Sequence, residues 1–164
     1  MRVYVRLFKP NKCRSVVILS SRRLRKTSQL SGGVTTEADD YFHGAKAMED
    51  DYIIACADLK RTTIDGRRTY YPYGAFVHPD FRNQGFGRIL YKACLMCIKH
   101  KMDSFNRKRK PLFVQHRIGD PSGSTSAAAK RVYKSLVKQG FLMPVDDGAY
   151  KIKKFPKLKY KIIE

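Results

Sequence analysis

Acidic residues are scarce in this sequence: 14 Asp and Glu stand against 34 Lys and Arg in 164 residues, which leaves a net charge of +20. The four cysteines are too few and too scattered for the disulfide framework of a small secreted protein, so we expect a reducing, cytoplasmic compartment. No apolar run approaches the ~20 residues of a membrane span, and the N-terminal residues lack the apolar stretch of a secretory signal. These absences argue against membrane proteins and disulfide-rich secreted proteins.

Apolar and aromatic residues are well represented. The sequence is 43% hydrophobic and contains 10 Tyr and 9 Phe, which argues against disorder despite the charge. A chain of this length buries enough surface to fold without disulfides or a metal ion. We therefore expect one domain over residues 1–164, with an oligomeric state that the sequence does not reveal.

The positive charge is unevenly distributed along the chain. Residues 1–36 carry +9, residues 37–65 carry −5, and residues 66–164 carry +16. The basic clusters lie at residues 22–26, 107–110 and 151–161. Such a charge predicts a polyanionic partner, with nucleic acid as the leading candidate, although charge runs are also common on ordinary solvated surfaces.

Hydrophobic periodicity predicts alternating strands and helices, an α/β or α+β fold. Asp65-Gly66 is a hairpin signal, and Pro72 favours an edge or a bulge in the strand that follows. The predicted strands are residues 3–7, 16–19, 52–59, 69–77, 112–115, 141–145, 149–154 and 157–163. The predicted helices are residues 36–48, the segment after Gly87 to about residue 101, and residues 126–139, the last ending at Gly140.

A glycine-containing segment, residues 82–88, joins a predicted strand to an amphipathic helix. Amides at a helix start lack intrahelical acceptors, and the helix dipole favours negative charge there. Gly85 and Gly87 keep side chains away from the backbone, while Arg82 and Arg88 flank it. The segment predicts a phosphate or pyrophosphate site. The alternative is that the glycines only permit close helix packing.

The run Val77-His-Pro-Asp-Phe-Arg-Asn-Gln-Gly-Phe-Gly87, followed by Ile89-Leu90, resembles the acetyl-CoA motif of the GNAT superfamily of N-acetyltransferases. The resemblance extends to the preceding hairpin and to the later helix that ends in Gly140-Phe141. It implies a single GNAT-like domain with a mixed, mostly antiparallel sheet, splayed at the CoA site and flanked by helices. It also implies acetyl-CoA as the donor substrate, with no metal.

The resemblance assigns cofactor-binding roles position by position. The loop amides would hold the CoA pyrophosphate, the strand edge at Phe76 and Val77 would pair with the pantetheine arm, and the Val77 amide would polarise the thioester carbonyl. Ser124 and Ser126 lie where the family often has an Asn that contacts CoA. The loop residues concerned are Arg82, Asn83, Gln84, Gly85, Phe86, Gly87 and Arg88.

The catalytic residues are less clearly indicated. Many family members have a Tyr four residues before the terminal Gly of the later helix, where this chain has Leu136. Tyr133, one turn earlier, is the candidate acid, although its place on the apolar stripe also fits core packing. Asp58 and His116 are candidate bases, and Glu37 and Asp39 are weaker ones.

Cys94 and Cys97 have the spacing of a redox or metal motif. They fall on the apolar stripe of the predicted helix, and a redox pair needs an exposed helix start. We therefore predict core packing for both and no metal site.

The sequence supports an acetyl-CoA-dependent N-acetyltransferase that acts on an amine. The acidic segment favours a cationic acceptor, whereas the basic surfaces favour an acceptor on, or associated with, a nucleic acid, and the latter is slightly preferred. The alternatives are a basic nucleic-acid-binding protein without catalysis and a CoA-binding adaptor or inhibitor.

Overall fold

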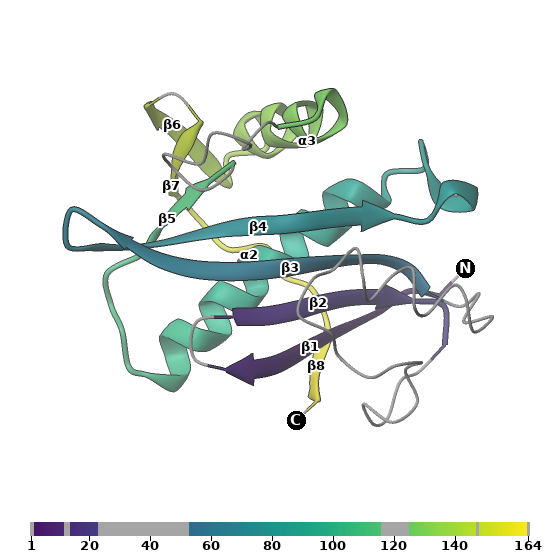
Figure 1. Ribbon diagram of the computed structural model, residues 1–164, viewed down its shortest axis with the longest axis horizontal. Helices are drawn as coiled ribbons and strands as arrows, with labels where there is room; N and C mark the ends of the chain where they lie inside the picture. The colour runs from purple at the N-terminus through teal and green to yellow at the C-terminus, as the bar shows by residue number, and fades with distance from the viewer. Residues whose placement is uncertain (1, 12–13, 23–52, 116–124, 147, 164) are drawn as a thin grey trace.

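The computed structural model describes residues 2–11, 14–22, 53–115, 125–146 and 148–163, and an eight-stranded sheet forms its centre (Figure 1). The strands lie in the order β6-β7-β5-β4-β3-β2-β1-β8 across the sheet. Their bounds are β1 Tyr4–Asn11, β2 Arg14–Ser20, β3 Ile53–Ile64, β4 Arg67–Val77, β5 Leu112–Val114, β6 Leu142–Asp146, β7 Ala149–Ile152 and β8 Tyr160–Ile163.

Antiparallel pairing dominates the sheet. Strands β1 to β4 form a continuous antiparallel set, and β5, β7 and β6 form another. Two pairings are parallel, β8 beside β1 and β5 beside β4. The β4–β5 step needs a crossover, which helix α2 (Phe86–Ser104) supplies. The sheet is therefore mixed and mostly antiparallel, which confirms the predicted fold class.

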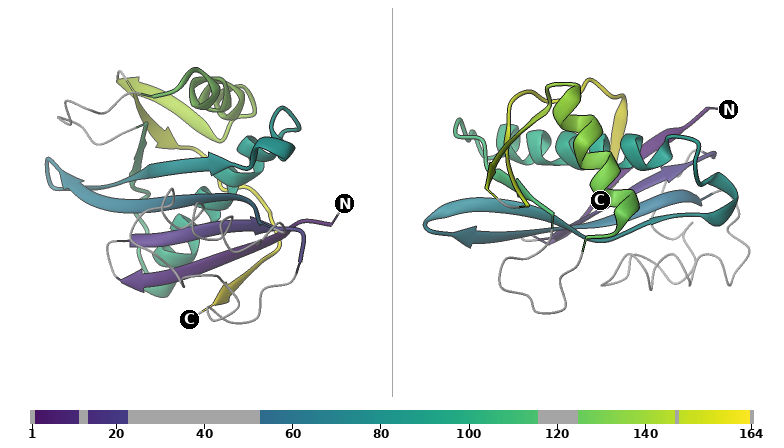
Figure 2. Two further views of the ribbon diagram at one scale, coloured as in Figure 1. Left: turned by 45° about the vertical axis from the view of Figure 1, so that its right-hand side comes forward. Right: turned by 90° about the horizontal axis from the view of Figure 1, so that it is seen from above.

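Helices α2 and α3 (Ala127–Lys138) lie on the same face of the sheet (Figure 2). The buried side of α2 packs against alternate side chains of the strands in one hydrophobic core, and fully burying such a side chain contributes about 1.5–3 kcal/mol. Members of this core include Leu90, Ala93, Cys94, Cys97 and Ile98 of α2 and Leu7, Val17, Leu19 and Leu59 of the sheet. Apolar burial therefore fixes α2, and with it the loop that precedes the helix.

Strand β4 separates from β5 part-way along its length. β5 pairs with β4 only at Thr69 and Tyr70, so β4 keeps β3 as its single described neighbour from there to Val77. In its pairing with β3, β4 carries a bulge that leaves Gly74 unpaired, at a φ of +68°. A bulge bends and twists the strand that carries it. The predicted splay is confirmed, and so is the edge or bulge expected from Pro72.

The other predicted elements are present, with their ends moved by a few residues. α3 stops at Gly140, where the amides of Gly140 and Phe141 donate to Val137 and Leu136 in a Schellman motif. β8 begins at Tyr160, later than its alternation predicts. The helix expected over residues 36–48 lies outside the described residues. In the part of the chain that is described, no helix is long and apolar enough to span a membrane.

Candidate active site

A sharp turn joins β4 to α2. The short helix η2 (Pro79–Phe81) follows β4, and its cap His78 accepts a hydrogen bond at Nδ1 from the Asp80 amide, at 3.1 Å. Asn83 and Gly85 then adopt left-handed backbone conformations, at φ values of +60° and +84°. Gly adopts this region freely and Asn more readily than most residues, so these two positions allow the turn to close onto the helix.

The amides at the start of α2 have no acceptors. The first backbone bond of the helix runs from the Ile89 amide to the Gly85 oxygen, at 3.4 Å. Among the described residues, no amide from 83 to 88 donates a hydrogen bond to another group. A Cβ at Gly85 would lie 3.3 Å from Nη2 of Arg88, so this guanidinium lies close over the bare backbone. Free amides, a helix N-terminus and a cation form a site for an anion.

The edge of β4 that faces away from β3 is also available. The His78 amide donates to the Ile54 oxygen on β3, at 2.8 Å. Because successive amides of a strand point to opposite edges, the Val77 amide points to the open edge and the Phe76 amide points toward β3. The Val77 carbonyl accepts from Nε of Arg82, at 3.1 Å, which fastens the loop to the end of the strand.

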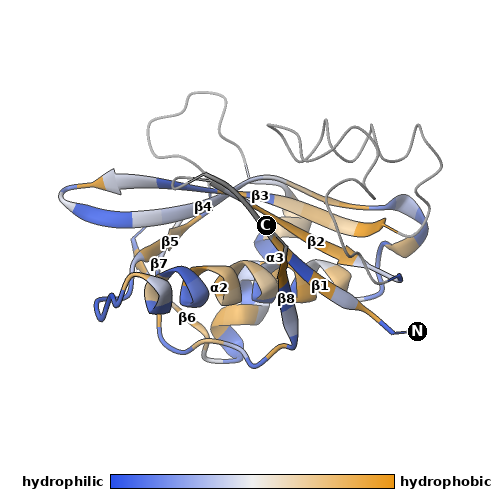
Figure 3. Cartoon of the chain, turned by 90° about the horizontal axis from the view of Figure 1, so that it is seen from below, coloured by the Kyte–Doolittle hydropathy of each residue, from blue (hydrophilic) through white to orange (hydrophobic). Residues whose placement is uncertain are grey.

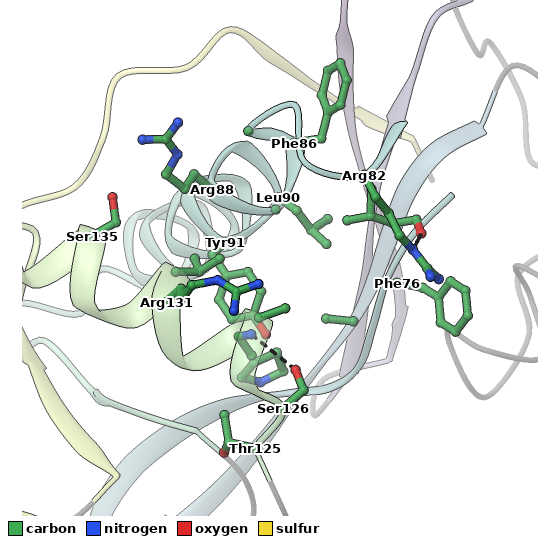
Figure 4. A pocket seen from close by; sticks show the side chains of 18 of the residues that line it. Phe76, Arg82, Phe86, Arg88, Leu90, Tyr91, Thr125, Ser126, Arg131 and Ser135 are labelled. Atoms are coloured by element: carbon green, nitrogen blue, oxygen red, sulfur yellow. Dashed lines mark hydrogen bonds between the residues drawn. The ribbon is translucent and has the colours of Figure 1, made fainter. Parts of the chain in front are cut away.

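A cleft of about 1010 Å³ joins these features. Its walls are the open half of β4 with the loop after it, the first turns of α2, and α3 with the residues just before it. Arg82 lies on one side, Arg131 extends from α3 on the other, and Leu90 and Tyr91 of α2 lie between them (Figure 4). The cleft therefore combines an apolar wall with cationic margins.

The α3 wall begins at a capped helix start. Ser126 is the N-cap of α3, and its hydroxyl accepts from the Ala129 amide at 3.1 Å. A Cβ at Gly87 would lie 3.4 Å from Cγ2 of Val132, an ordinary van der Waals contact, so α3 packs directly beside α2 here. Gly85, by contrast, is favoured by its left-handed backbone conformation.

Residues 15–108 match the model of the acetyltransferase (GNAT) family, and this span is more than half of the chain. The protein belongs to the GNAT family. The match covers nearly all of β2 and continues through α2, and thus includes the whole loop of residues 82–88. A comparison with curated proteins finds no match to the chain. GNAT proteins are acetyltransferases that use acetyl-CoA as the donor, which agrees with the predicted donor.

The cleft fits the GNAT donor on the features seen in this fold. The loop offers unpaired amides to phosphates, Arg82, Arg88 and Arg131 add positive charge, and the open strand edge can pair with an extended amide-containing arm. Ser126 lines the same cleft. Gln84 is not among the described residues that line the cleft. Its side-chain amide donates to the Asp80 backbone oxygen, at 3.0 Å, and braces the turn. Ser124 lies outside the described residues.

Tyr133 is packed inside the GNAT core. Only 1% of its surface is exposed, its ring stacks on Tyr150 at 5.2 Å between centroids, and it meets Tyr91 edge-on at 5.3 Å. Its hydroxyl lies 3.5 Å from the Val114 oxygen. Burial raises the pKa of this phenol well above its usual value of 10. Tyr133 is not among the described residues that line the cleft.

The predicted bases are not in the described cleft wall either. Asp58 lies on β3 beside the bulge, paired with Tyr73, and is fully buried. His116, like Glu37 and Asp39, lies outside the described residues. Among the described residues that line the cleft there is neither a carboxylate nor an imidazole.

Tyr91 and Arg131 are among the cleft residues that sequence reasoning missed. Tyr91 lines the cleft with 6% of its surface exposed, its ring meets the Tyr133 ring edge-on, and burial raises the pKa of its phenol. It lies one turn after Gly87, a spacing that could have indicated it. Arg131 reaches the cleft only because α3 packs beside α2, and no local signal marks it.

Cys94 and Cys97 are both fully buried on α2, as predicted. Burial raises the pKa of the Cys94 thiol far above its usual value of about 9. Such a thiol stays protonated and unreactive at neutral pH, so the pair serves packing.

Proposed function

We propose that this GNAT protein transfers the acetyl group of acetyl-CoA to an amine, with the cleft between β4, α2 and α3 as the donor site. The observation that carries the proposal is the set of unpaired amides at residues 83–88, beside the open edge of β4. Acetyl-CoA contains a pyrophosphate, which backbone amides can bind, and an extended arm, which a strand edge can pair with. One cleft of this fold contains both kinds of binding group.

The loop and the strand divide the work of holding the donor. The amides of residues 83–88 would bind the pyrophosphate, with Arg88 over Gly85 and Arg131 on the opposite wall supplying positive charge. The Val77 amide, on the open edge, would donate to the carbonyl that becomes more negative during transfer. When bound, acetyl-CoA supplies the acetyl group as an activated thioester.

Tyr91 is the proton donor that we propose for the released sulfur, in place of Tyr133. It is the phenol among the described residues that line the cleft, and its ring packs edge-on against Tyr133, at 5.3 Å between centroids. This ring contact holds Tyr91 in place. Because burial raises its pKa, Tyr91 keeps its proton across the neutral range until a stronger base forms beside it.

The acceptor is proposed to be an amine on a nucleic acid or on a protein bound to one. A neutral amine attacks, so its proton must leave to a base, and water fills this role where no described side chain does. Asp58 and His116 stay predictions as bases. The excess of positive charge supports the choice of acceptor, because one CoA molecule requires only a few of the 34 basic residues.

A second candidate function has one observation in its favour. Leu136 occupies the position at which many GNAT enzymes carry the acidic Tyr, and it is fully buried. A CoA-binding adaptor without catalysis would have the same donor cleft. Turnover separates the two: an adaptor is stabilised by acetyl-CoA but transfers nothing.

The test uses labelled acetyl-CoA and the purified protein. Binding is measured as a thermal shift, where a ligand at 100 times its Kd adds about 2.7 kcal/mol. Transfer is measured as label incorporated into protein, RNA and DNA fractions of a cell extract. Label in an RNA- or DNA-associated fraction supports the proposal. Absence of any shift at millimolar acetyl-CoA would overturn the donor site, and label confined to free small amines would overturn the acceptor.

A further inference from the structure

A second, smaller pocket lies at the other end of β4, away from the donor cleft. It encloses about 190 Å³ between the β3–β4 hairpin and the carboxyl end of α2. Its walls are Arg61, Arg68, Tyr70, Lys101, Phe105 and Arg107, which we call the basic pocket. Four of these six side chains are cationic, and none is acidic. Figure 3 shows hydrophilic residues both along the hairpin and in the loop that follows α2.

The cations of the basic pocket are held in place. Arg68 donates from Nη2 to the Arg109 oxygen, at 3.2 Å. Lys101 is only 5% exposed, and its Nζ lies 5.8 Å from the centre of the Tyr70 ring. Arg61 lines the same pocket beside Tyr70. Ordered cations around one small cavity bind an anion better than mobile surface lysines, because less side-chain entropy is lost.

The end of α2 is also rigid. Asn106 adopts a φ of +50°, its amide donates to the Asp103 oxygen at 3.2 Å, and the Arg107 amide donates to the Met102 oxygen at 2.8 Å. This is a Schellman motif, which fixes Phe105 and Arg107 on either side of Asn106. The helix dipole places about half a negative charge at this end, and four cations outweigh it. The nearby Asp103 carboxylate is paired with Lys99, at 2.6 Å.

Phe105 distinguishes this pocket from an ordinary basic surface. Its ring is 58% exposed, the highest value among the exposed large hydrophobic residues of the described chain. An exposed aromatic ring beside fixed cations is the pairing that single-stranded nucleic acids require: bases stack on the ring while phosphates meet the charges. Neither the donor cleft nor the sheet core uses Phe105, since it lies outside both.

We propose that the basic pocket binds single-stranded nucleic acid, with backbone phosphates at Arg61, Arg68, Lys101 and Arg107 and a base stacked on Phe105. This deepens the proposed function, because it names the partner beside which the acceptor amine lies. The statement that the acceptor amine lies beside this nucleic acid rests on the proposed function. Nucleic-acid binding at the basic pocket does not.

The charge arm of the test compares two double variants that each lose two positive charges. R68Q/R107Q removes charge from the basic pocket, and K134Q/K138Q removes it from the exposed side of α3. Fluorescence anisotropy with a labelled RNA strand of about 12 nucleotides reports the Kd. We expect R68Q/R107Q to raise the Kd at least about tenfold and to reduce the salt slope by about 1.4, and the α3 control to change the Kd less than about threefold.

The stacking arm compares Phe105→Ala with Val145→Ala, another exposed apolar residue, on β6. Loss of one stacked base predicts a Kd about tenfold higher for F105A, with the salt slope unchanged. V145A should bind as the wild type does. A 2-aminopurine placed in the strand should change its fluorescence on binding to the wild type and not on binding to F105A.

The outcomes separate this inference from the donor site. All variants should keep the thermal shift with acetyl-CoA, which also shows that they fold. If R68Q/R107Q and F105A bind RNA as the wild type does, or if K134Q/K138Q weakens binding as much, the inference is wrong. Tighter binding of heparin or of a duplex with the same charge would also overturn it. Pocket-dependent RNA binding without any acetyl-CoA shift would support it and refute the proposed function instead.

Discussion

The two ends of β4 present two different ways of meeting a phosphate. At the donor cleft the main donors are backbone amides, exposed because Gly85 and the helix start leave them bare. At the basic pocket the donors are side chains, braced by Tyr70 and by the capped end of α2. Backbone amides lie at fixed positions and therefore suit one shape of ligand. Cationic side chains attract any polyanion, so an aromatic ring such as Phe105 is needed to favour single-stranded nucleic acid over other polyanions.

Gly85→Ala should have the largest effect. Alanine at a φ of +84° is strained, and its Cβ would push the Arg88 guanidinium away by a few tenths of an ångström. We expect the Kd for acetyl-CoA, measured by calorimetry, to rise about a hundredfold, equivalent to about 2.7 kcal/mol. RNA binding should be unchanged.

Gly66→Ala is the matched control for that change. Gly66 has a φ of +72° in the hairpin turn, with open space where the Cβ would lie. It should lose similar stability and no acetyl-CoA affinity. Equal affinity losses at both positions would mean that strain, and not the amide cradle, accounts for the effect.

Tyr91→Phe should slow catalysis without weakening binding. General acids contribute roughly a hundredfold or more, so kcat should fall by about that factor while KM stays within about threefold. Because its raised pKa lies above 10, no loss of activity below about pH 10 should be due to ionisation of Tyr91. Tyr133→Phe should lower stability and leave kcat nearly unchanged. The reverse result would return the acid role to Tyr133.

The next-largest effect should be a difference in salt dependence between ligand binding at the donor cleft and at the basic pocket. With three or four phosphate contacts, a fourfold rise in salt should weaken RNA binding by about 20- to 50-fold. Acetyl-CoA binding, measured in the same buffers, should weaken less than about fivefold, because amides release few counterions. Parallel salt slopes for the two ligands would remove the distinction between amide and cation recognition.

Ser126→Ala should have the smallest effect. Loss of the N-cap bond to the Ala129 amide costs about 1 kcal/mol, which urea denaturation can measure. Acetyl-CoA affinity should fall only a few-fold, through the α3 wall. Affinity unchanged at that loss of stability would show that α3 contributes little to the donor cleft.

The sequence predicted the donor end better than the basic end because the donor loop is a local feature. Glycine spacing, a strand before it and an amphipathic helix after it are all contained within a few residues. Arg131 enters that cleft only through the packing of α3 on α2 past Gly87. A close approach of this kind between distant segments leaves no trace in periodicity.

Helical spacing could not choose between Tyr133 and Tyr91 as the candidate acid. Tyr133 and Tyr91 are both aromatic residues on apolar helix stripes, and helical spacing does not tell which of two touching rings faces the cleft. Likewise, residues 107–110 could be predicted only as a basic cluster that favours a polyanion, with no indication of a pocket. The pocket appears only when the α2 cap turns Phe105 and Arg107 toward Arg61 and Arg68 on the hairpin.

The length of β4 sets a distance. Arg68, in the basic pocket, and Val77, at the donor cleft, are the two ends of one strand, which rises about 3.3 Å per residue and so separates them by roughly 30 Å. A strand paired with β3 on both sides of the Gly74 bulge does not stretch. Under the two proposals β4 would act as a molecular ruler: a polymer anchored at Phe105 would present for modification the amine that lies about that far along it, whatever its sequence.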